Sequence, residues 1–239
     1  MKKLTRKLIL ALITVLILIS IYIWGRGFLL YKKVSKNKNL SNSINQIKTS
    51  EKFVSWDEMP QYYKDAVIAV EDHRFYEHGT VDFIAIARAL TSNFKQKDLA
   101  EGGSTITQQV VKNLYFMESN TKNDSLDRKI AEIIIGIQLE KNYSKEEIFE
   151  LYVNNIYFGD GYYCLKDAAK GYFNKEPKDM TLYESTLLAG IPNAPSVYSP
   201  NVNPELSKQR QKKVISSMVK YGYLTQEEAE KIIDKNCNL

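Results

Sequence analysis

Two glutamates are the candidate acid–base residues of this sequence. Glu71 follows the apolar run AVIAV, at the point where a helix would leave the core. Partial desolvation at that point would raise its pKa, as a catalytic acid or base requires. Glu132 lies one helical turn after Arg128 and could simply form an ordinary ion pair along a helix. A solvated helix end is the commoner setting for a glutamate such as Glu71, so both interpretations stay open.

The stretch GGSTITQQVVKN, residues 102–113, has the composition of a ligand-binding loop that leads into a helix. Its glycines permit tight turning and close approach of a ligand to the backbone. Thr105 with Gln108 fits a capping box, which predicts a helix start there. Gln109 and Lys112 follow within one turn, so N–H, hydroxyl, amide and ammonium groups gather where an anion such as phosphate could bind. A flexible loop before a capped helix explains the composition equally well, and the P-loop spelling is absent.

Apolar residues at helical spacing predict helices through most of the chain from Phe53 onward, without hairpin signals or repeats. Asp82 is placed to cap a helix that begins FIAIARAL, and Ser144 with Glu147 makes a capping box. The stretch IPNAPSVYSP contains three prolines and predicts an ordered but irregular loop. With 239 residues and 44% hydrophobic content, the chain can build one core, so the sequence predicts an all-α domain.

The N-terminal part of the chain predicts a membrane anchor. Residues 8–24 are apolar apart from two hydroxyl residues, which is about the minimum length for a bilayer core. No small-x-small cleavage site follows, which favours an uncleaved signal anchor over a signal peptide or a buried helix. The predicted organisation is a basic cytoplasmic tail at 1–7, a transmembrane anchor at 8–24, a polar stalk or linker at 25–52, and the domain at 53–239.

Charge and cysteine content exclude several classes of protein. Residues 1–40 carry nine basic and no acidic residues, so the net charge of +5 belongs to the N-terminus and the remainder is acidic by four charges. The isoelectric point is therefore no argument for nucleic-acid binding. Two cysteines have no metal-binding spacing, and His73 and His78 form no H-E-x-x-H pattern, so the sequence predicts no metal site.

Five ordered blocks of the chain, over about residues 53–200, together resemble the glycosyltransferase domain of peptidoglycan synthases. That lysozyme-like family polymerises lipid II. The first three blocks read E-D-x-x-F-x-x-H, G-G-S-T-I-T-Q-Q-x-x-K-N and R-K-x-x-E. The stretches IFELYVNNIYFG and AAKGYF resemble the fourth block, and LLAGIPNAPSVYSP resembles the fifth. The matched positions of the first three blocks are Glu71, Asp72, Phe75, His78, residues 102–113, Arg128, Lys129 and Glu132.

The resemblance implies a two-lobed lysozyme-like domain behind a single transmembrane helix, and it implies a reaction. Glu71 would be the base that deprotonates the 4-hydroxyl of the incoming lipid II. That oxygen would attack the anomeric carbon of the lipid-linked chain end, with inversion and release of undecaprenyl pyrophosphate. Glu132 would assist on the donor side, and Lys112, Arg128 and Lys129 would balance the negative charge of the leaving group. The implied substrate-binding residues are Asp72, Phe75, Ser104, Thr105, Gln108, Gln109, Lys112, Asn113, Arg128, Lys129, Glu150 and Asn154.

The resemblance also implies the surroundings of the enzyme. No cofactor is required, with a divalent cation (Mg²⁺ or Mn²⁺) as an option. The partners are lipid II, the growing lipid-linked glycan, the membrane, and other cell-wall synthesis or division proteins, with no nucleic acid. The location is the plasma membrane of a bacterium, single-pass, with the catalytic domain on the extracellular face. The apolar residues 114–117 belong either to a small lobe that dips into the bilayer or to the core.

The sequence departs from the family pattern at three positions, and it leaves three further functions to consider. The glycine expected two residues after His78 stands directly after it, Asp124 occupies the place of a frequent arginine, and Cys164 that of a glycine. Residues 217–220 spell S-x-x-K, but they lie in a charged amphipathic pattern without K-T-G, so the sequence predicts no transpeptidase. A lysozyme-like lytic enzyme and a catalytically impaired membrane-anchored scaffold both stay compatible with the residues.

Overall fold

The computed structural model describes residues 2–93, 103–117 and 126–235, and every regular element in these ranges is helical. The all-α prediction is therefore confirmed. Three short 3₁₀ turns lie at Trp56–Glu58, Pro177–Asp179 and Ile191–Asn193. The helices are α1 (Lys2–Asn37), α2 (Leu40–Lys48), α3 (Gln61–Glu71), α4 (Phe83–Asn93), α5 (Ile106–Tyr115), α6 (Leu126–Asn142), α7 (Lys145–Val153), α8 (Leu165–Phe173), α9 (Leu182–Gly190), α10 (Pro195–Tyr198), α11 (Pro204–Lys220) and α12 (Gln226–Lys235).

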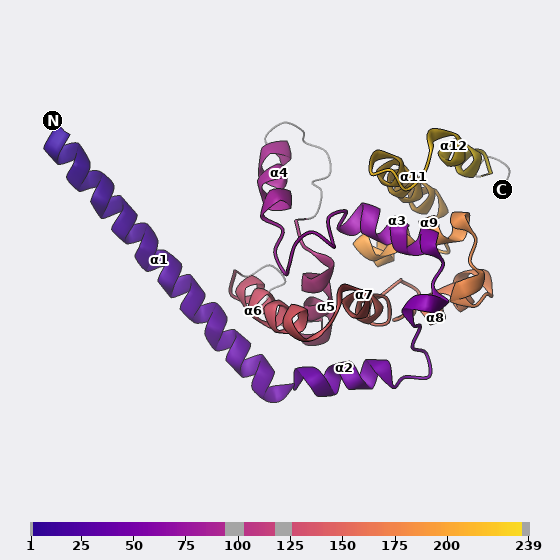
Figure 1. The fold of residues 1–239 in the computed structure, drawn as a ribbon, viewed down its shortest axis with the longest axis horizontal. Helices are drawn as coiled ribbons and strands as arrows, with labels where there is room; N and C mark the ends of the chain where they lie inside the picture. The colour runs from indigo at the N-terminus through magenta and orange to yellow at the C-terminus, as the bar shows by residue number, and fades with distance from the viewer. Residues whose placement is uncertain (1, 94–102, 118–125, 236–239) are drawn as a thin grey trace.

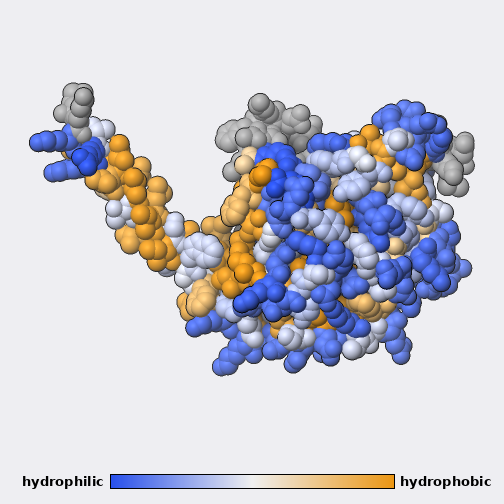
Figure 2. Space-filling view, viewed as in Figure 1, coloured by the Kyte–Doolittle hydropathy of each residue, from blue (hydrophilic) through white to orange (hydrophobic). Residues whose placement is uncertain are grey.

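Helix α1 projects from the body of the molecule as a long rod, with its N-terminus far from the other helices (Figure 1). Among the described residues, it is the helix that is long and apolar enough to cross a membrane, with a mean hydropathy of 2.7 over 18 residues. Figure 2 shows this apolar surface along α1 beside a largely hydrophilic body. The predicted span at residues 8–24 lies in its exposed part, where only Ile23 is partly covered. Such a surface is suited to lipid and poorly suited to water.

The segment predicted as a polar stalk, residues 25–52, is folded onto the domain. The end of α1 packs along α6, where Tyr31 accepts a hydrogen bond from Gln138 and Arg26 forms an ion pair with Asp127. In α2, Ile44 is 2% exposed and belongs to the main core. The stalk prediction was wrong because the polar composition hid apolar residues at helical spacing, namely Leu30, Val34, Leu40, Ile44 and Ile47.

The core separates two groups of helices (Figure 1). Helix α5 packs against α6 and α7, whereas α3 packs against α9 and α11. The largest fully buried side chains are aromatic, and all belong to the one main core cluster: Tyr63, Phe75, Phe116, Phe149, Tyr152 and Phe158. Phe116 therefore follows the core interpretation of residues 114–117, although Met117 is exposed. This arrangement brings the end of α3 and the starts of α5 and α6 to one place.

The predicted N-terminal caps of α4, α5 and α7 are present. Asp82 accepts hydrogen bonds from the backbone of Ile84 and Ala85 at 2.9 and 3.0 Å, which begins α4. Thr105 accepts from Gln108 N at 3.2 Å, which begins α5, but the Gln108 side chain makes no return bond, so the predicted capping box is only half formed there. The capping box of Ser144 and Glu147 is complete. The proline-rich stretch differs from the predicted irregular loop, because prolines at the first helical positions start a 3₁₀ turn and α10.

Candidate active site

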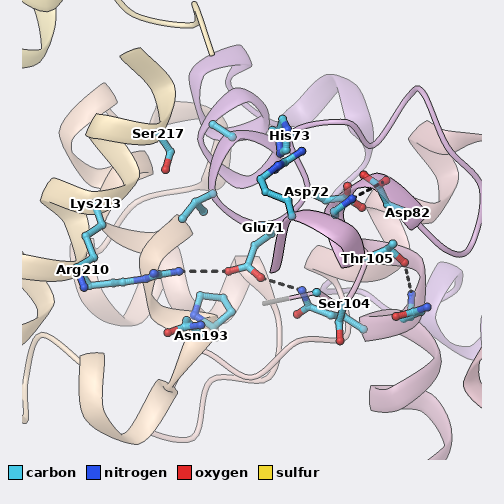
Figure 3. Close-up of a pocket in the computed structure, with 18 of the residues that line it drawn as sticks. Glu71, Asp72, His73, Asp82, Ser104, Thr105, Asn193, Arg210, Lys213 and Ser217 are labelled. Carbon is cyan, nitrogen blue, oxygen red and sulfur yellow. Dashed lines mark hydrogen bonds and ion pairs between the residues drawn. The ribbon is translucent and has the colours of Figure 1, made fainter. Parts of the chain in front are cut away.

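A cleft of about 980 Å³ lies between the two groups of helices (Figure 3). Its walls come from the end of α3, the start of α5, the start of α6, and the long helix α11 with the turn before α10. The cleft is lined by ten residues that the sequence proposed: Glu71, Asp72, Ser104, Thr105, Gln108, Gln109, Lys112, Arg128, Lys129 and Glu132. The folded chain thus brings four of the five motif blocks into one cavity, the fifth block through Pro192, Asn193 and Tyr198.

Glu71 is the last residue of α3, and its side chain is only 10% exposed. Gln109 of α5 donates a hydrogen bond to its Oε2 at 2.8 Å, and Nη2 of Arg210 lies 3.6 Å from its Oε1. Burial raises the pKa of Glu71, whereas the Gln109 hydrogen bond and the Arg210 charge act in the lowering direction without cancelling the rise. A carboxylate with a raised pKa in a cleft is the arrangement that a general base requires.

Glu132 is 1% exposed and lies among cations at the start of α6. Its two carboxylate oxygens lie 3.4 Å from Nε of Arg128 and 3.2 Å from Nζ of Lys129. Lys129 also donates a hydrogen bond to Ser104 at 2.9 Å. The ion pair expected from the Arg128–Glu132 spacing is therefore present, and it lies inside the cleft. This cluster links α6 to the loop before α5.

Basic side chains line opposite walls of the cleft. Lys112 of α5 is exposed and lies on the wall that also holds the α6 cations. Arg210, Lys212, Lys213 and Lys220 come from α11, which forms the other wall. Two basic walls with a nearly buried carboxylate between them suit ligands that carry phosphate groups.

Four predicted substrate-binding residues lie outside this cleft. Phe75 is fully buried and contacts the ring of Phe149 in the core. Glu150 accepts a hydrogen bond from the backbone N–H of Trp56 at 2.7 Å. Asn154 bonds to both the N–H and the carbonyl of Val54. Asn113 is not among the described residues that line the cavity. In this structure the first three side chains make structural contacts, and Glu150 and Asn154 fasten the chain before α3 to α7. Their substrate-binding roles stay predictions.

Asp72 and Thr105 line the cleft but also hold its backbone together. Asp72 lies 2.6 Å from His78 Nε2 and accepts from the backbone N–H of Ile106 at 3.0 Å. Thr105 donates its hydroxyl hydrogen to the carbonyl of Thr80 at 2.8 Å. These bonds join the end of α3 and the following loop to the start of α5. They also order the loop that contains Gly79, the glycine displaced from the family pattern. Asp124, another departure from that pattern, lies outside the described residues.

One group of metal-ligating residue types occurs in the described part of the chain: Asp72, His78 and Asp82. Its carboxylates are already engaged, because Asp82 caps α4 and lies 3.3 Å from the guanidinium of Arg74. Asp72 accepts from a backbone N–H and faces His78. A bound cation would have to compete with an arginine charge at the same oxygens, so these side chains do not fit a divalent site.

The sequence reasoning missed the α11 wall. Arg210, Lys213, Ser217 and Lys220 are spaced by three or four residues, which places them on one helix face. That spacing is visible in the sequence, but by itself it indicates only a charged helix face exposed to solvent. The sequence does not show that another helix faces it across a cleft. Asn193 lies beside Arg210 in Figure 3 and was missed as well, because the turn that carries it was expected to be irregular.

Comparisons with known proteins agree with the geometry. The family model described as Transglycosylase matches residues 37–219. Penicillin-binding protein 1F of Bacillus subtilis is 44% identical over 176 residues, which is 74% of this chain and 24% of the relative. Penicillin-binding protein 1A of Neisseria flavescens is 42% identical over 181 residues, 76% of this chain and 22% of the relative. This chain thus spans about a quarter of the length of the curated relatives it matches.

One solved structure is also similar in part. Penicillin-binding protein 1A from Haemophilus influenzae matches 54% of this chain and 15% of its own, at 26% identity and a TM-score of 0.36. The family match begins at residue 37, before the predicted domain start at 53, and so includes α2.

Proposed function

Because this chain belongs to the transglycosylase family, we propose that it is a peptidoglycan glycosyltransferase that polymerises lipid II into β-1,4-linked glycan strands. The observation that carries the proposal is the position of Glu71. Its carboxylate lies in a cleft between two basic walls, at the end of α3. Such a cleft can hold two phosphate-bearing substrates with a base between them.

The proposed reaction starts with proton transfer to Glu71. Its carboxylate takes the proton from the 4-hydroxyl of the N-acetylglucosamine of the incoming lipid II. The resulting oxygen forms a bond to the anomeric carbon at the lipid-linked end of the growing chain. The bond from that carbon to the pyrophosphate breaks, the leaving group keeps the electron pair, and the configuration inverts. Undecaprenyl pyrophosphate is released.

The α5–α6 wall supplies the charges that this step needs. Lys112, Arg128 and Lys129 would balance the negative charge that grows on the pyrophosphate, and Glu132 would hold the two α6 cations in place. Preorganised charges of this kind are often the largest contribution to catalysis, and removal of one group costs on the order of 10²–10³ in rate. The step as proposed uses only groups of the chain, without a cofactor or metal.

The apolar helix α1 gives this reaction its location. Both proposed substrates carry polyprenyl tails, so an enzyme anchored in the same bilayer meets them in two dimensions. We place the span at residues 8–24 and the catalytic domain on the extracellular face of the plasma membrane. Proteins of cell-wall synthesis or division are the expected partners there.

Polymerisation of labelled lipid II by the detergent-solubilised chain tests the proposal. Wild type is compared with Glu71→Gln and with Glu146→Gln, an exposed glutamate of α7 that serves as a control. Glycan ladders on a gel from wild type and the control, but not from Glu71→Gln, are expected. Lipid II binding without polymer from wild type would contradict the proposal and favour a scaffold. Cleavage of finished glycan would instead indicate a lytic enzyme.

A further inference from the structure

Arg210 is held beside Glu71 by contacts that do not depend on Glu71. Its Nε donates a hydrogen bond to the carbonyl of Gly190, at the end of α9, at 3.3 Å. Its guanidinium lies over the ring of Tyr198 of α10, 5.9 Å from the ring centre. Its side chain is 14% exposed. Three elements thus fix one cation at the cleft wall, and Figure 3 shows it pointing at the carboxylate.

Gly190 makes room for the stem of this arginine. A Cβ atom at position 190 would lie 2.9 Å from Cγ of Arg210, which is closer than real side chains approach. The arginine can therefore lie flat against the end of α9 only because residue 190 has no side chain. A guanidinium that is fixed on its own scaffold loses little further freedom when it pairs with a carboxylate.

The oxygen of Glu71 that faces Arg210 has no other support in the described part of the chain. Oε2 accepts the Gln109 hydrogen bond, but Oε1 accepts none and has its ion pair with Arg210 at 3.6 Å. A nearly buried, half-satisfied carboxylate has a strong tendency to take up a proton. A proton on Glu71 would remove its ability to act as the base.

We propose that Arg210 is a positioning residue that keeps Glu71 ionised and aimed into the cleft before substrate binds. The inference rests on the proposed role of Glu71 as the base. Arg210 acts through Glu71 and does not itself touch the reacting atoms. It gives α11 a role in the chemical step, in addition to forming a basic wall.

The other groups around Glu71 do not replace this cation. Asp72 is adjacent and acts in the direction that disfavours a second negative charge. Tyr152 of α7 is fully buried near Glu71, and its hydroxyl makes no hydrogen bond within the described residues. The other charged or titratable side chains that line the same cavity come from every wall: His73, Asp82, Arg88 of α4, Lys112 of α5, Arg128, Lys129 and Glu132 of α6, and Lys212, Lys213 and Lys220 of α11. The α6 cations are already paired with Glu132.

The sign of the expected effect follows from this geometry. Without the positive charge at Arg210, burial is less opposed, so the pKa of Glu71 rises further. The carboxylate is then protonated at a higher pH, and the rate falls earlier as the solution is acidified. The acid limb of a kcat/KM profile reports groups of the free enzyme, which is the state in which Arg210 faces Glu71.

The experiment measures pH–rate profiles at low lipid II concentration for wild type, Arg210→Gln and Arg210→Lys. Lys208→Gln is the control on the same helix, because Lys208 pairs with an exposed glutamate and does not line the cleft. We expect Arg210→Gln to move the acid limb to higher pH by about one unit. At pH values below the limb, kcat/KM should then be about tenfold lower than in wild type. Arg210→Lys keeps a positive charge, so its acid limb should lie close to that of wild type. An unmoved limb in Arg210→Gln overturns the proposal.

A second readout separates this inference from the proposed function. The Glu71 carboxyl is titrated by ¹³C NMR in the full-length chain in detergent, with Glu71→Gln used to assign the signal. A higher titration midpoint in Arg210→Gln supports the Arg210 role even if wild type fails to polymerise lipid II. An unchanged midpoint overturns it even if wild type is active.

Arg210→Gln also loses the Gly190 and Tyr198 contacts, so a second variant guards against a folding defect. Tyr198→Leu removes the ring beneath the guanidinium and keeps the charge. It should move the midpoint in the same direction by a smaller amount, and thermal unfolding of each variant identifies any that is misfolded. A midpoint equal to that of wild type in a folded Tyr198→Leu would show that the scaffold does not hold Arg210 in place.

Discussion

His78 Nε2 lies 2.6 Å from Oδ1 of Asp72, and both side chains are 5% exposed. The other ring nitrogen, Nδ1, faces the carbonyl of Gly79, so both nitrogens point at acceptors. Burial alone would lower the pKa of His78, but the Asp72 hydrogen bond, the Gly79 carbonyl and the Asp72 charge raise it above its usual value of 6.5. The imidazolium form is therefore favoured in the folded chain, at the joint between α3 and α5.

This joint makes the stability of the domain depend on pH. A histidine with a raised folded pKa contributes stability that is fully present below about pH 6.5, and that is lost as pH rises through the folded pKa. We expect the Tm of wild type to fall between pH 6 and pH 9 more steeply than that of His78→Gln. Thermal unfolding at several pH values measures this. A wild-type slope in His78→Gln would contradict the prediction.

The raised pKa of Glu71 predicts that activity and stability conflict at this residue. Its folded pKa lies above the usual 4.5, so the folded carboxyl binds a proton more tightly than the unfolded chain does. Ionised Glu71 therefore costs stability above about pH 4.5, and the cost is complete well above the folded pKa. Glu71→Gln should raise Tm at pH 7, because it removes this cost. The expected rise is about 2–4 °C for each ~1 kcal/mol of unfolding free energy that the ionised carboxylate costs.

The comparison of two pH values isolates this cause. At pH 4 the carboxyl of wild type is largely protonated, so the difference in Tm between wild type and Glu71→Gln should shrink. Glu146→Gln, on the exposed side of α7, should change Tm little at either pH. A lower Tm for Glu71→Gln at pH 7 would mean that the ionised carboxylate stabilises the fold, contrary to this prediction.

Asn154 should prove to be a structural residue and not a substrate ligand. Asn154→Ala removes its hydrogen bonds to Val54 N–H and Val54 C=O at 2.8 Å each, and leaves these groups partly buried and unpaired. The expected cost is about 1–3 kcal/mol of unfolding free energy, measured by denaturant titration. The apparent KM for lipid II should stay at the wild-type value. Asn142→Ala, on the exposed end of α6, is the control, and a large KM increase in Asn154→Ala alone would restore the binding role.

Two glycines of α1 allow a matched test of the α1–α6 contact. A Cβ on Gly27 would lie 2.5 Å from Cβ of Ile130, whereas one on Gly25 meets nothing within 4 Å. Gly27→Val should therefore force α1 away from α6 and cost about 1–3 kcal/mol, while Gly25→Val should leave stability close to wild type. Ile130 lies between Lys129 and Glu132 in sequence, so Gly27→Val should also slow polymerisation. Equal effects of the two variants in Tm and rate would show that this contact does not form.

The caps were predictable from the sequence because they are local. Asp82 and Ser144 each accept a hydrogen bond from a backbone N–H three residues later, so both partners of the interaction lie within one short stretch of sequence. Arg210 could not be found in this way, because it meets Glu71 across 139 positions and only the packed α3–α11 pair joins them. A sequence motif also does not distinguish a residue that contacts substrate from one that supports the structure around the cleft. Phe75 and Asn154 were therefore predicted to bind substrate, although in the structure they pack in the core and bond to the backbone of Val54.

Helix α1 continues without interruption from the predicted span to its contact with α6. A helix of 36 residues is about 54 Å long, and each residue advances it by about 1.5 Å and turns it by about 100°. The orientation of the domain relative to the apolar segment is thus set by the helical phase of α1 and not by the reach of a flexible tether. One residue inserted between the span and Gly27 would turn the domain by more than a quarter of a circle around the helix axis. With α1 spanning the bilayer as proposed, its unbroken continuation into the domain would fix the height and tilt of the cleft relative to the membrane, which a flexible tether would leave open.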